Sequence, residues 1–149
     1  MRRIMALAFL LTVVTALSGP ARAEDGRYLV QMPARMQEHM LTSMRDHLVV
    51  LGDILAHVAA ERYGEASKIA EERLGMSSYD LHDSRHMAAF MPKPMQEAGD
   101  RLHRSSSRFA ILAKDVDIAR SYESMLGLSR ALNEMTSACN ACHAGFRIR

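Results

Sequence analysis

The sequence predicts an all-α protein folded as an antiparallel four-helix bundle. Helix-favouring Ala, Leu, Met, Glu and Arg dominate the 149 residues, which include only four prolines and eight glycines. Aromatic residues are scarce, with no Trp, four Tyr and four Phe. Four segments have helical character, and no segment reads as a strand, a hairpin or a βαβ unit. Bundles of this kind commonly hold cofactors in their cores.

Residues 1–23 have the parts of a secretory signal peptide. The basic start Arg2-Arg3 precedes the apolar run 4–17, and the small-x-small sequence Ala21-Arg22-Ala23 follows it. The apolar run is too short for a stable membrane span. We therefore expect residues 1–23 to be removed and a single bundle domain, residues 24–149, to be exported to the periplasm.

Removing this segment changes the charge of the chain. The 19 Lys and Arg residues include three within residues 1–23, which leaves 16 against 17 acidic residues and a net charge of −1. A nearly neutral chain gives no electrostatic reason to expect binding to nucleic acid or anionic lipid. No apolar run of about 18 residues remains, so we also expect no membrane insertion.

Turn-forming residues divide the remaining chain. Pro33 suits the first turn of a helix, Tyr63-Gly64 interrupts that helix, and Gly75 is the expected C-terminal cap of the next one. Pro92 and Pro94 lie in a long connection, residues 76–94. Four helices are expected, at about 33–62, 65–74, 94–116 and 119–146. Shorter pieces are a leader at 24–32, one helical turn near 84–90 and a turn at 115–118.

Both cysteines belong to one short motif near the C-terminus. Cys139-Asn140-Ala141-Cys142-His143 has the C-x-x-C-H pattern of haem c attachment. Thiols three residues apart lie on one side of a helical turn and add to the two haem vinyl groups, and the next imidazole reaches the iron. A disulfide, a redox-active dithiol and a metal site are the alternatives, although so short a disulfide loop would restrain the fold little. We expect one covalently bound haem c per chain, close to the C-terminus.

The distal iron ligand is expected on the first helix. In an up-down bundle the first and last helices run antiparallel, so the start of the first helix lies beside His143. This start is rich in methionine, with Met36, Met40 and Met44. Met40 is the expected distal ligand and Met44 the second choice. The alternative is that these methionines only pack the core, as Met commonly does.

Helical phase supports this order. At about 100° per residue from Met36, Met40 lies at about 40°, Met44 at about 80° and His47 at about 20°. The leucines taken as core residues lie between about 60° and 120°; they are Leu48, Leu51 and Leu55. His47 is then on the flank of the core face and about 10 Å beyond Met40 along the axis, which makes it a poor third choice.

The tail from Cys139 to Arg147 resembles the cytochrome c′ family, the class II c-type cytochromes, in which the haem motif ends a four-helix bundle. The segment 44–52 is similar to the first helix of that family. The resemblance implies that Cys139 and Cys142 form the haem thioethers, that His143 is the proximal ligand and that Arg147 lies near it. It also implies a homodimer formed through the early helices.

The family divides at the distal position, which corresponds to residues 40–41. Low-spin members carry a methionine that ligates iron, and they transfer electrons. High-spin members carry an apolar residue there and bind nitric oxide or carbon monoxide. Met40 and Leu41 leave both possibilities open, and this chain is most similar to the low-spin members. It departs from the family in having Met36, not Arg, one turn before Met40.

We therefore expect a non-enzymatic periplasmic electron carrier that exchanges single electrons with redox partner proteins. The first alternative is a five-coordinate protein that binds nitric oxide or carbon monoxide. The second is a copper(I)-handling protein, because thioethers select copper(I). The residues that suggest copper are His39, Met40, Met44, His47, His82, His86, Met87, Met91 and Met95.

Overall fold

A computed structural model describes residues 25–79 and 84–149, so the expected signal peptide, residues 1–23, lies outside the described part. The prediction of an all-α protein is confirmed. Five α-helices occupy the described residues: α2 (Ala34–Ala59), α3 (Tyr63–Arg73), α4 (Ser84–Ala88), α5 (Lys93–Ile118) and α6 (Tyr122–Gly145). A 3-10 turn, η1 (Met76–Ser78), follows α3.

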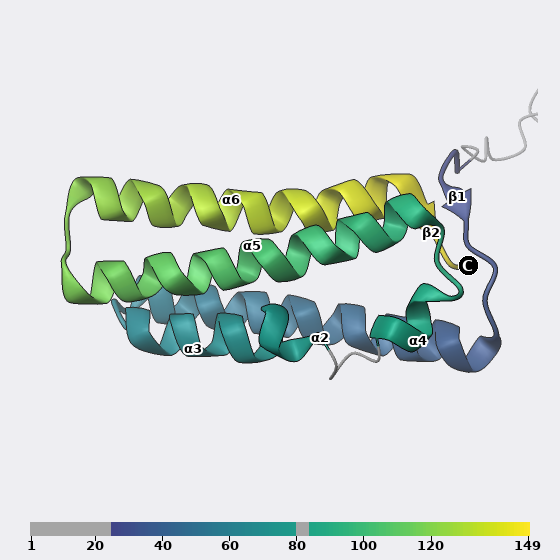
Figure 1. The fold of residues 1–149 in the computed structure, drawn as a ribbon, viewed down its shortest axis with the longest axis horizontal. Coiled ribbons are helices and arrows are strands. Elements are labelled where there is room, and N and C mark those ends of the chain that lie inside the picture. The colour runs from purple at the N-terminus through teal and green to yellow at the C-terminus, as the bar shows by residue number, and fades with distance from the viewer. Residues whose placement is uncertain (1–24, 80–83) are drawn as a thin grey trace, which may run out of the picture.

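The four longer helices lie side by side along the long axis of the molecule (Figure 1). α2 packs on α3, α3 on α5, and α5 on α6. The C-terminal end of α6 lies at the same end of the molecule as the start of α2, and α4 is drawn beside the start of α2 (Figure 1). The start of the first long helix and the end of the last one are therefore at the same end of the molecule, as the up-down arrangement predicts.

Two short strands join the ends of the described chain, although the sequence predicted no strand. β1 (Tyr28–Leu29) pairs in parallel with β2 (Phe146–Arg147), so that Tyr28 lies opposite Phe146. The Val30 amide extends the pairing by donating to the Arg147 carbonyl at 2.8 Å. The predicted leader is thus a structural element, which pairs with the residues immediately after the C-x-x-C-H motif.

Helix boundaries follow the turn signals, with three corrections. α2 ends at Ala59, and the reversal uses Glu61 with a left-handed φ of 57°, so the break lies before Tyr63, which is buried at the start of α3. Gly75 follows the cap residue Leu74 and has an ordinary φ of −75°. A Cβ on Gly75 would lie 2.8 Å from the Glu71 Cα, so glycine is needed there for close packing. The turn expected at 115–118 is absent because α5 continues, with Val116 fully buried.

Two clusters of buried side chains divide the interior. The first, which we call the closed core, is rich in alanine and contains Val50, Ile54, Tyr63, Ala66, Ala70, Leu74, Phe109, Ala110, Ala113, Val116, Leu128, Ala131 and Met135. The second, the methionine cluster, contains Val30, Met32, Met36, Met87 and Met95, with Met40, Phe90, Met91, Cys142, Phe146 and Ile148 packed against them.

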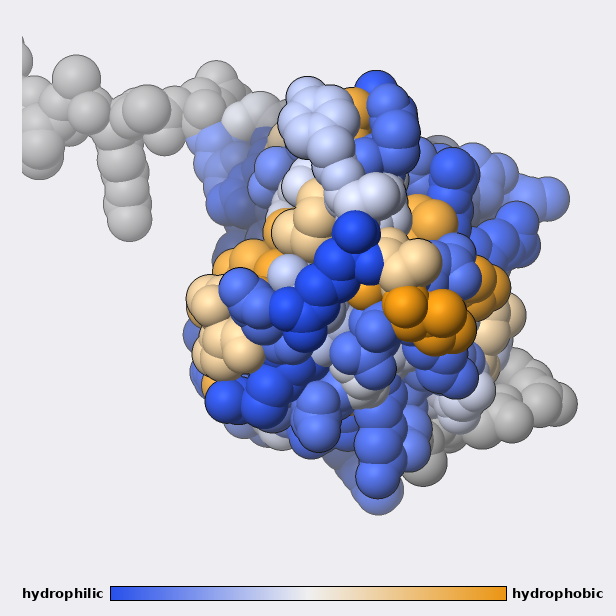
Figure 2. Space-filling model, turned by 90° about the vertical axis from the view of Figure 1, so that its left-hand side faces the viewer, coloured by the Kyte–Doolittle hydropathy of each residue, from blue (hydrophilic) through white to orange (hydrophobic). Residues whose placement is uncertain are grey.

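The surface at the end formed by the α2–α3 and α5–α6 connections is mostly hydrophilic, with separate hydrophobic side chains (Figure 2). Ile118 and Tyr122, at the adjoining ends of α5 and α6, are among the most exposed large apolar residues. In the described residues, no helix combines the length and the apolar character that crossing a bilayer would require.

Candidate haem-binding site

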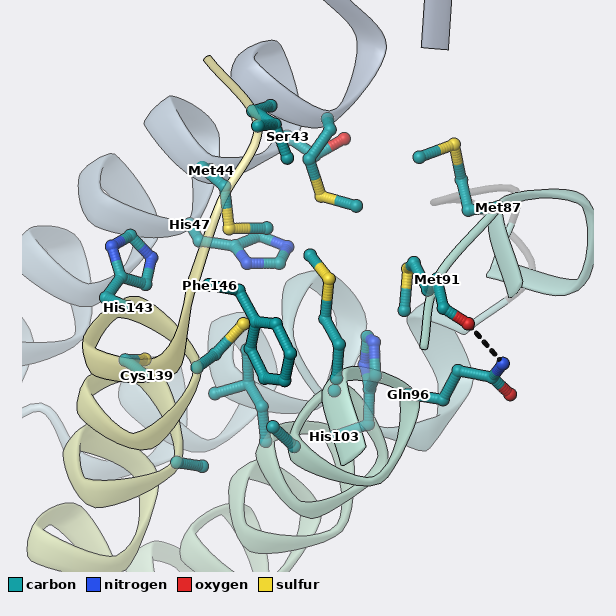
Figure 3. A pocket seen from close by; sticks show the side chains of 18 of the residues that line it. Ser43, Met44, His47, Met87, Met91, Gln96, His103, Cys139, His143 and Phe146 are labelled. Atoms are coloured by element: carbon teal, nitrogen blue, oxygen red, sulfur yellow. Dashed lines mark hydrogen bonds between the residues drawn. The ribbon is translucent and has the colours of Figure 1, made fainter. Parts of the chain in front are cut away.

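A cavity of about 660 Å³ lies at the end of the molecule where α6 terminates. Ligand pockets in proteins commonly have volumes of about 300–1,000 Å³. Its walls come from α2, α4, α5 and α6, and sulfur atoms point into it from several of these helices (Figure 3). The methionines that line it are Met40, Met44, Met87, Met91, Met95 and Met135. The cavity is therefore large, mostly apolar and rich in thioethers.

α6 brings Cys139, Cys142 and His143 to this cavity. The two cysteines are half-buried free thiols, and His143 is exposed at the edge of the site. Burial raises the pKa of both thiols, and the nearby Cys139 raises that of Cys142 further. Protonated thiols are poor nucleophiles, so this environment does not favour a redox-active dithiol.

The donor set fits a covalently attached haem. Two thiols three residues apart and the following imidazole all line one cavity, which has an apolar wall opposite them. An apolar, partly enclosed space is what a porphyrin requires, and thiols with an adjacent imidazole are the groups that hold haem c.

The inward face of α2 differs from the one expected. Its buried residues are Met36, Val50 and Ile54, whereas Leu48 and Leu55 are 70% and 43% exposed. The assumption that these two leucines belong to the core is therefore wrong. Val50 and Ile54 lie at about −40° and 0° from Met36, so the inward face is centred near Met36 itself.

This correction brings His47 onto the inward face. Met40, Met44 and His47 all line the cavity, and Figure 3 shows the His47 ring among the side chains of the cavity and the His143 ring at its edge. His47 lies about 20° from Met36, so it is closer to the centre of the face than Met44, at about 80°. His47 is therefore a stronger candidate for the distal ligand than the sequence analysis indicated. Met40 remains the expected distal ligand.

His103, on α5, lines the same cavity and was not singled out from the sequence. It is only 5% exposed, and its Nδ1 lies 2.9 Å from the Leu74 carbonyl oxygen. A carbonyl only accepts, so in the neutral ring this nitrogen carries the proton. The His103 ring lies 6.5 Å from the His47 ring and 5.1 Å from the Tyr79 ring, centre to centre. These contacts join residues far apart in the chain, and no local spacing indicates them.

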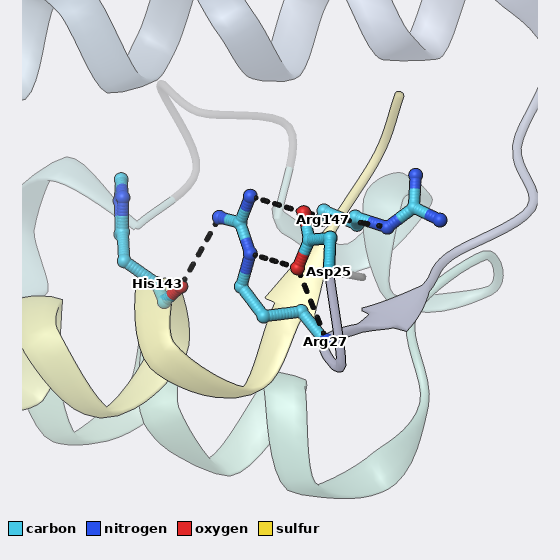
Figure 4. A network of polar contacts seen from close by, with 4 residues as sticks. All are labelled: Asp25, Arg27, His143 and Arg147. Carbon is cyan, nitrogen blue, oxygen red and sulfur yellow. Dashed lines mark hydrogen bonds and ion pairs between the residues drawn. The ribbon is translucent and has the colours of Figure 1, made fainter. Parts of the chain in front are cut away.

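The segment 25–30, which we call the N-terminal strap, brings charged groups to the end of α6 (Figure 4). The Arg27 guanidinium donates to Asp25 from Nε at 2.9 Å and from Nη2 at 2.7 Å. Its Nη1 donates to the His143 carbonyl oxygen at 3.3 Å. Arg147 lies on the same carboxylate, with its Nε 3.6 Å from Asp25 Oδ2. Arg147 is thus linked to the His143 carbonyl through Asp25 and Arg27. The sequence did not indicate Asp25 or Arg27.

The residues that suggested copper are only partly brought together. His39, Met40, Met44, His47, Met87, Met91 and Met95 line the cavity. His86 stacks edge-on against Phe90 with the ring centres 5.9 Å apart, and His82 lies outside the described residues. Within residues 25–79 and 84–149, no group of three or more His, Cys, Asp or Glu side chains could hold a metal ion. Any copper site in the described part would therefore need methionine sulfur.

Comparison of the chain with family models, curated proteins and solved structures finds no match.

Proposed function

We propose that this protein is a c-type cytochrome that carries single electrons through one covalently bound haem c. The observation that carries the proposal is that Cys139, Cys142 and His143 line one thioether-rich cavity. The side-by-side packing of α2, α3, α5 and α6 supports a four-helix bundle like that of the cytochrome c′ family.

The chain would hold the group through residues of two opposite walls. Cys139 and Cys142 would form the thioethers, and His143 would be the proximal ligand. Bound haem would supply one-electron redox chemistry. Met40 would supply a thioether from α2, and such a ligand raises the reduction potential and keeps substrates from the iron. The apolar side chains of the methionine cluster exclude water from this end of the molecule.

The remaining parts of the proposal follow from the sequence. Residues 1–23 direct export to the periplasm, where haem attachment and electron exchange with redox partner proteins take place. The protein acts as a carrier and not as an enzyme. The resemblance to the cytochrome c′ family also implies a homodimer formed through the early helices.

Absorption spectra of the purified holoprotein test the function. Covalent haem is detected first, as haem that stays with the chain on a denaturing gel. Low-spin ferric and ferrous bands that do not change with carbon monoxide support the electron carrier. A high-spin spectrum that shifts promptly with carbon monoxide would instead support a five-coordinate protein. Absence of covalent haem would overturn the proposal as a whole.

Three matched variants on one helix identify the distal ligand. Met40→Ala should abolish the Met-to-iron charge-transfer band and convert the spectrum to high spin. Met44→Ala and His47→Ala should leave this band in place. A spectrum that changes only in His47→Ala would keep the electron carrier and assign bis-histidine ligation.

Binding of nitric oxide or carbon monoxide is the second candidate function. It is favoured by Leu41, which lines the cavity beside Met40 and would leave an apolar, non-bonding wall there. In this case Met40→Ala would hardly change the spectrum, and Met40→Trp would slow carbon monoxide binding by narrowing the pocket.

Copper(I) binding is the third candidate and is favoured only by the gathering of thioethers in the cavity. Titration of the holoprotein with copper(I) against a chromophoric chelator tests it. A protein that takes no copper(I) from the chelator would exclude this function.

A further inference from the structure

The C-terminal end of α6 carries the proposed proximal ligand, and it lacks a glycine cap. Its cap residue is Phe146, which is extended with φ −131° and ψ 149° and continues directly into β2. The last carbonyl groups of a helix have no partner within the helix and form the negative end of its dipole. One of them is the His143 carbonyl, which accepts a hydrogen bond from Arg27.

Arg27 is held in place over this carbonyl from two sides. Asp25 fixes the guanidinium through two side-chain hydrogen bonds and accepts a third from the Arg27 amide at 3.1 Å. The pairing of β1 with β2 fixes the backbone, because Tyr28 and Leu29 are hydrogen-bonded to the residues that follow α6. Val30, next in the strap, is 1% exposed within the methionine cluster, which also includes Cys142.

These contacts also set the charge beside His143. Asp25 contributes one negative charge, and Arg27 and Arg147 contribute two positive ones. The contact between Asp25 and Arg27 favours the ionised form of both: the hydrogen bonds from Arg27 lower the pKa of Asp25 to about 2, and Asp25 raises the pKa of Arg27. A net positive charge close to a redox centre disfavours its oxidised form, which carries one more positive charge than the reduced form.

We propose that the N-terminal strap is an electrostatic and positioning element for the proximal histidine. Arg27 caps the helix that carries His143 and raises the reduction potential, whereas Asp25 holds Arg27 in place and partly offsets its charge. This inference rests on the proposed function, since it needs a redox centre bound through His143. Arg27 and Asp25 are positioning residues, because they act through the backbone and the field of the site.

Reduction potentials of the holoprotein variants test the proposal. Arg27→Gln removes a positive charge and should lower the potential. Asp25→Asn removes a negative charge but keeps one acceptor oxygen that can hold Arg27, so it should raise the potential. Arg27→Lys keeps the charge and should restore most of the potential. Both shifts should shrink as salt is added, because exposed charges are screened over about 10 Å at 0.1 M ionic strength. Arg35→Gln, an exposed arginine in the first turn of α2, is the matched control and should have the smaller effect.

The signs of the two shifts decide the outcome. Simple loosening of the end of α6 would move the potential in the same direction in both variants, and this result would overturn the proposal. Equal potentials in all variants would overturn it as well. Covalent attachment is checked on a denaturing gel in every variant. Loss of haem from the unmodified chain counts against the proposed function, and loaded variants without opposite shifts count against the strap alone.

Discussion

The closed core and the methionine cluster occupy opposite halves of one set of helices and are built differently. In the closed core, five alanines and one phenylalanine are at most 5% exposed, so the helices approach closely and fill the interior by themselves. The methionine cluster surrounds a cavity of about 660 Å³ and uses long, unbranched side chains that adapt to irregular shapes. The closed core is filled by its own side chains, whereas the methionine cluster has the shape and the side chains to surround a bound group.

Truncation in the closed core should give the largest loss of stability. Phe109 is fully buried there, and Phe109→Ala removes packing that the surrounding alanines cannot replace. We expect it to lower the free energy of unfolding by about 3–5 kcal/mol, measured by urea denaturation followed through helical circular dichroism. The control Ile111→Ala, on the same helix at a site 62% exposed, should stay within about 0.5 kcal/mol. Similar losses for the two variants would contradict the closed packing.

Truncation in the methionine cluster should depend on the haem. Met95 is 5% exposed beside the cavity, so Met95→Ala should cost more in the holoprotein than in the haem-free Cys139→Ala/Cys142→Ala chain. Groups in contact typically show coupling energies of about 0.5–3 kcal/mol. The cost of Phe109→Ala should be the same in both backgrounds. An equal cost of Met95→Ala with and without haem would show that the cluster is complete by itself.

The sequence predicts some features of this fold and not others. The helices follow from local signals such as Pro33 before α2 and Pro94 in the first turn of α5. The up-down chain direction brings the start of α2 and the C-terminal end of α6 to the same end of the molecule. The orientation of α2 did not follow, because this helix is apolar on two sides: Ile54 is buried while Leu48 is exposed. A periodic pattern with two apolar faces does not show which face lies inside.

Long-range contacts at the cavity were beyond any local pattern. His103 is placed by the Leu74 carbonyl, 29 residues away, and Arg27 reaches His143 across 116 residues. The β1–β2 pairing involves two residues on each side, too short for a pattern of alternation to be visible. Spacing rules find motifs such as C-x-x-C-H, whereas the groups that surround such a motif become known from the fold.

The outer face of α2, which belongs neither to the closed core nor to the methionine cluster, carries exposed leucine side chains. Leu48 and Leu55 are exposed and lie seven residues apart along one side of the helix, with Leu48 also at the rim of the cavity. If the chain forms the homodimer that the resemblance implies, this stripe is its natural contact. Leu55→Glu should then give a monomer in analytical ultracentrifugation, and Lys93→Glu, on another helix, should not. Because Leu55 is 43% exposed in the single chain and is not among the residues that line the cavity, the helical content and haem spectrum should hardly change. An unmodified chain that sediments as a monomer would rule the dimer out.

The smallest effect should come from acid, at the strap that closes the methionine cluster. Hydrogen bonds from Arg27 lower the pKa of Asp25 to about 2, from its ordinary value of 3.8. A carboxyl group with a lowered pKa stabilises the folded state above its unfolded pKa, and this contribution is lost as the pH falls through the folded pKa. Between about pH 4 and pH 2 the strap should therefore loosen, with faster exchange of the Val30 amide hydrogen that bonds to Arg147.

The exposed position of Asp25 keeps the effect small and local, so closed-core amides should not respond in this window. In Asp25→Asn the exchange of Val30 should lose this pH dependence, and titration of Asp25 near pH 3.8 in the unmodified protein would show that Arg27 does not hold it.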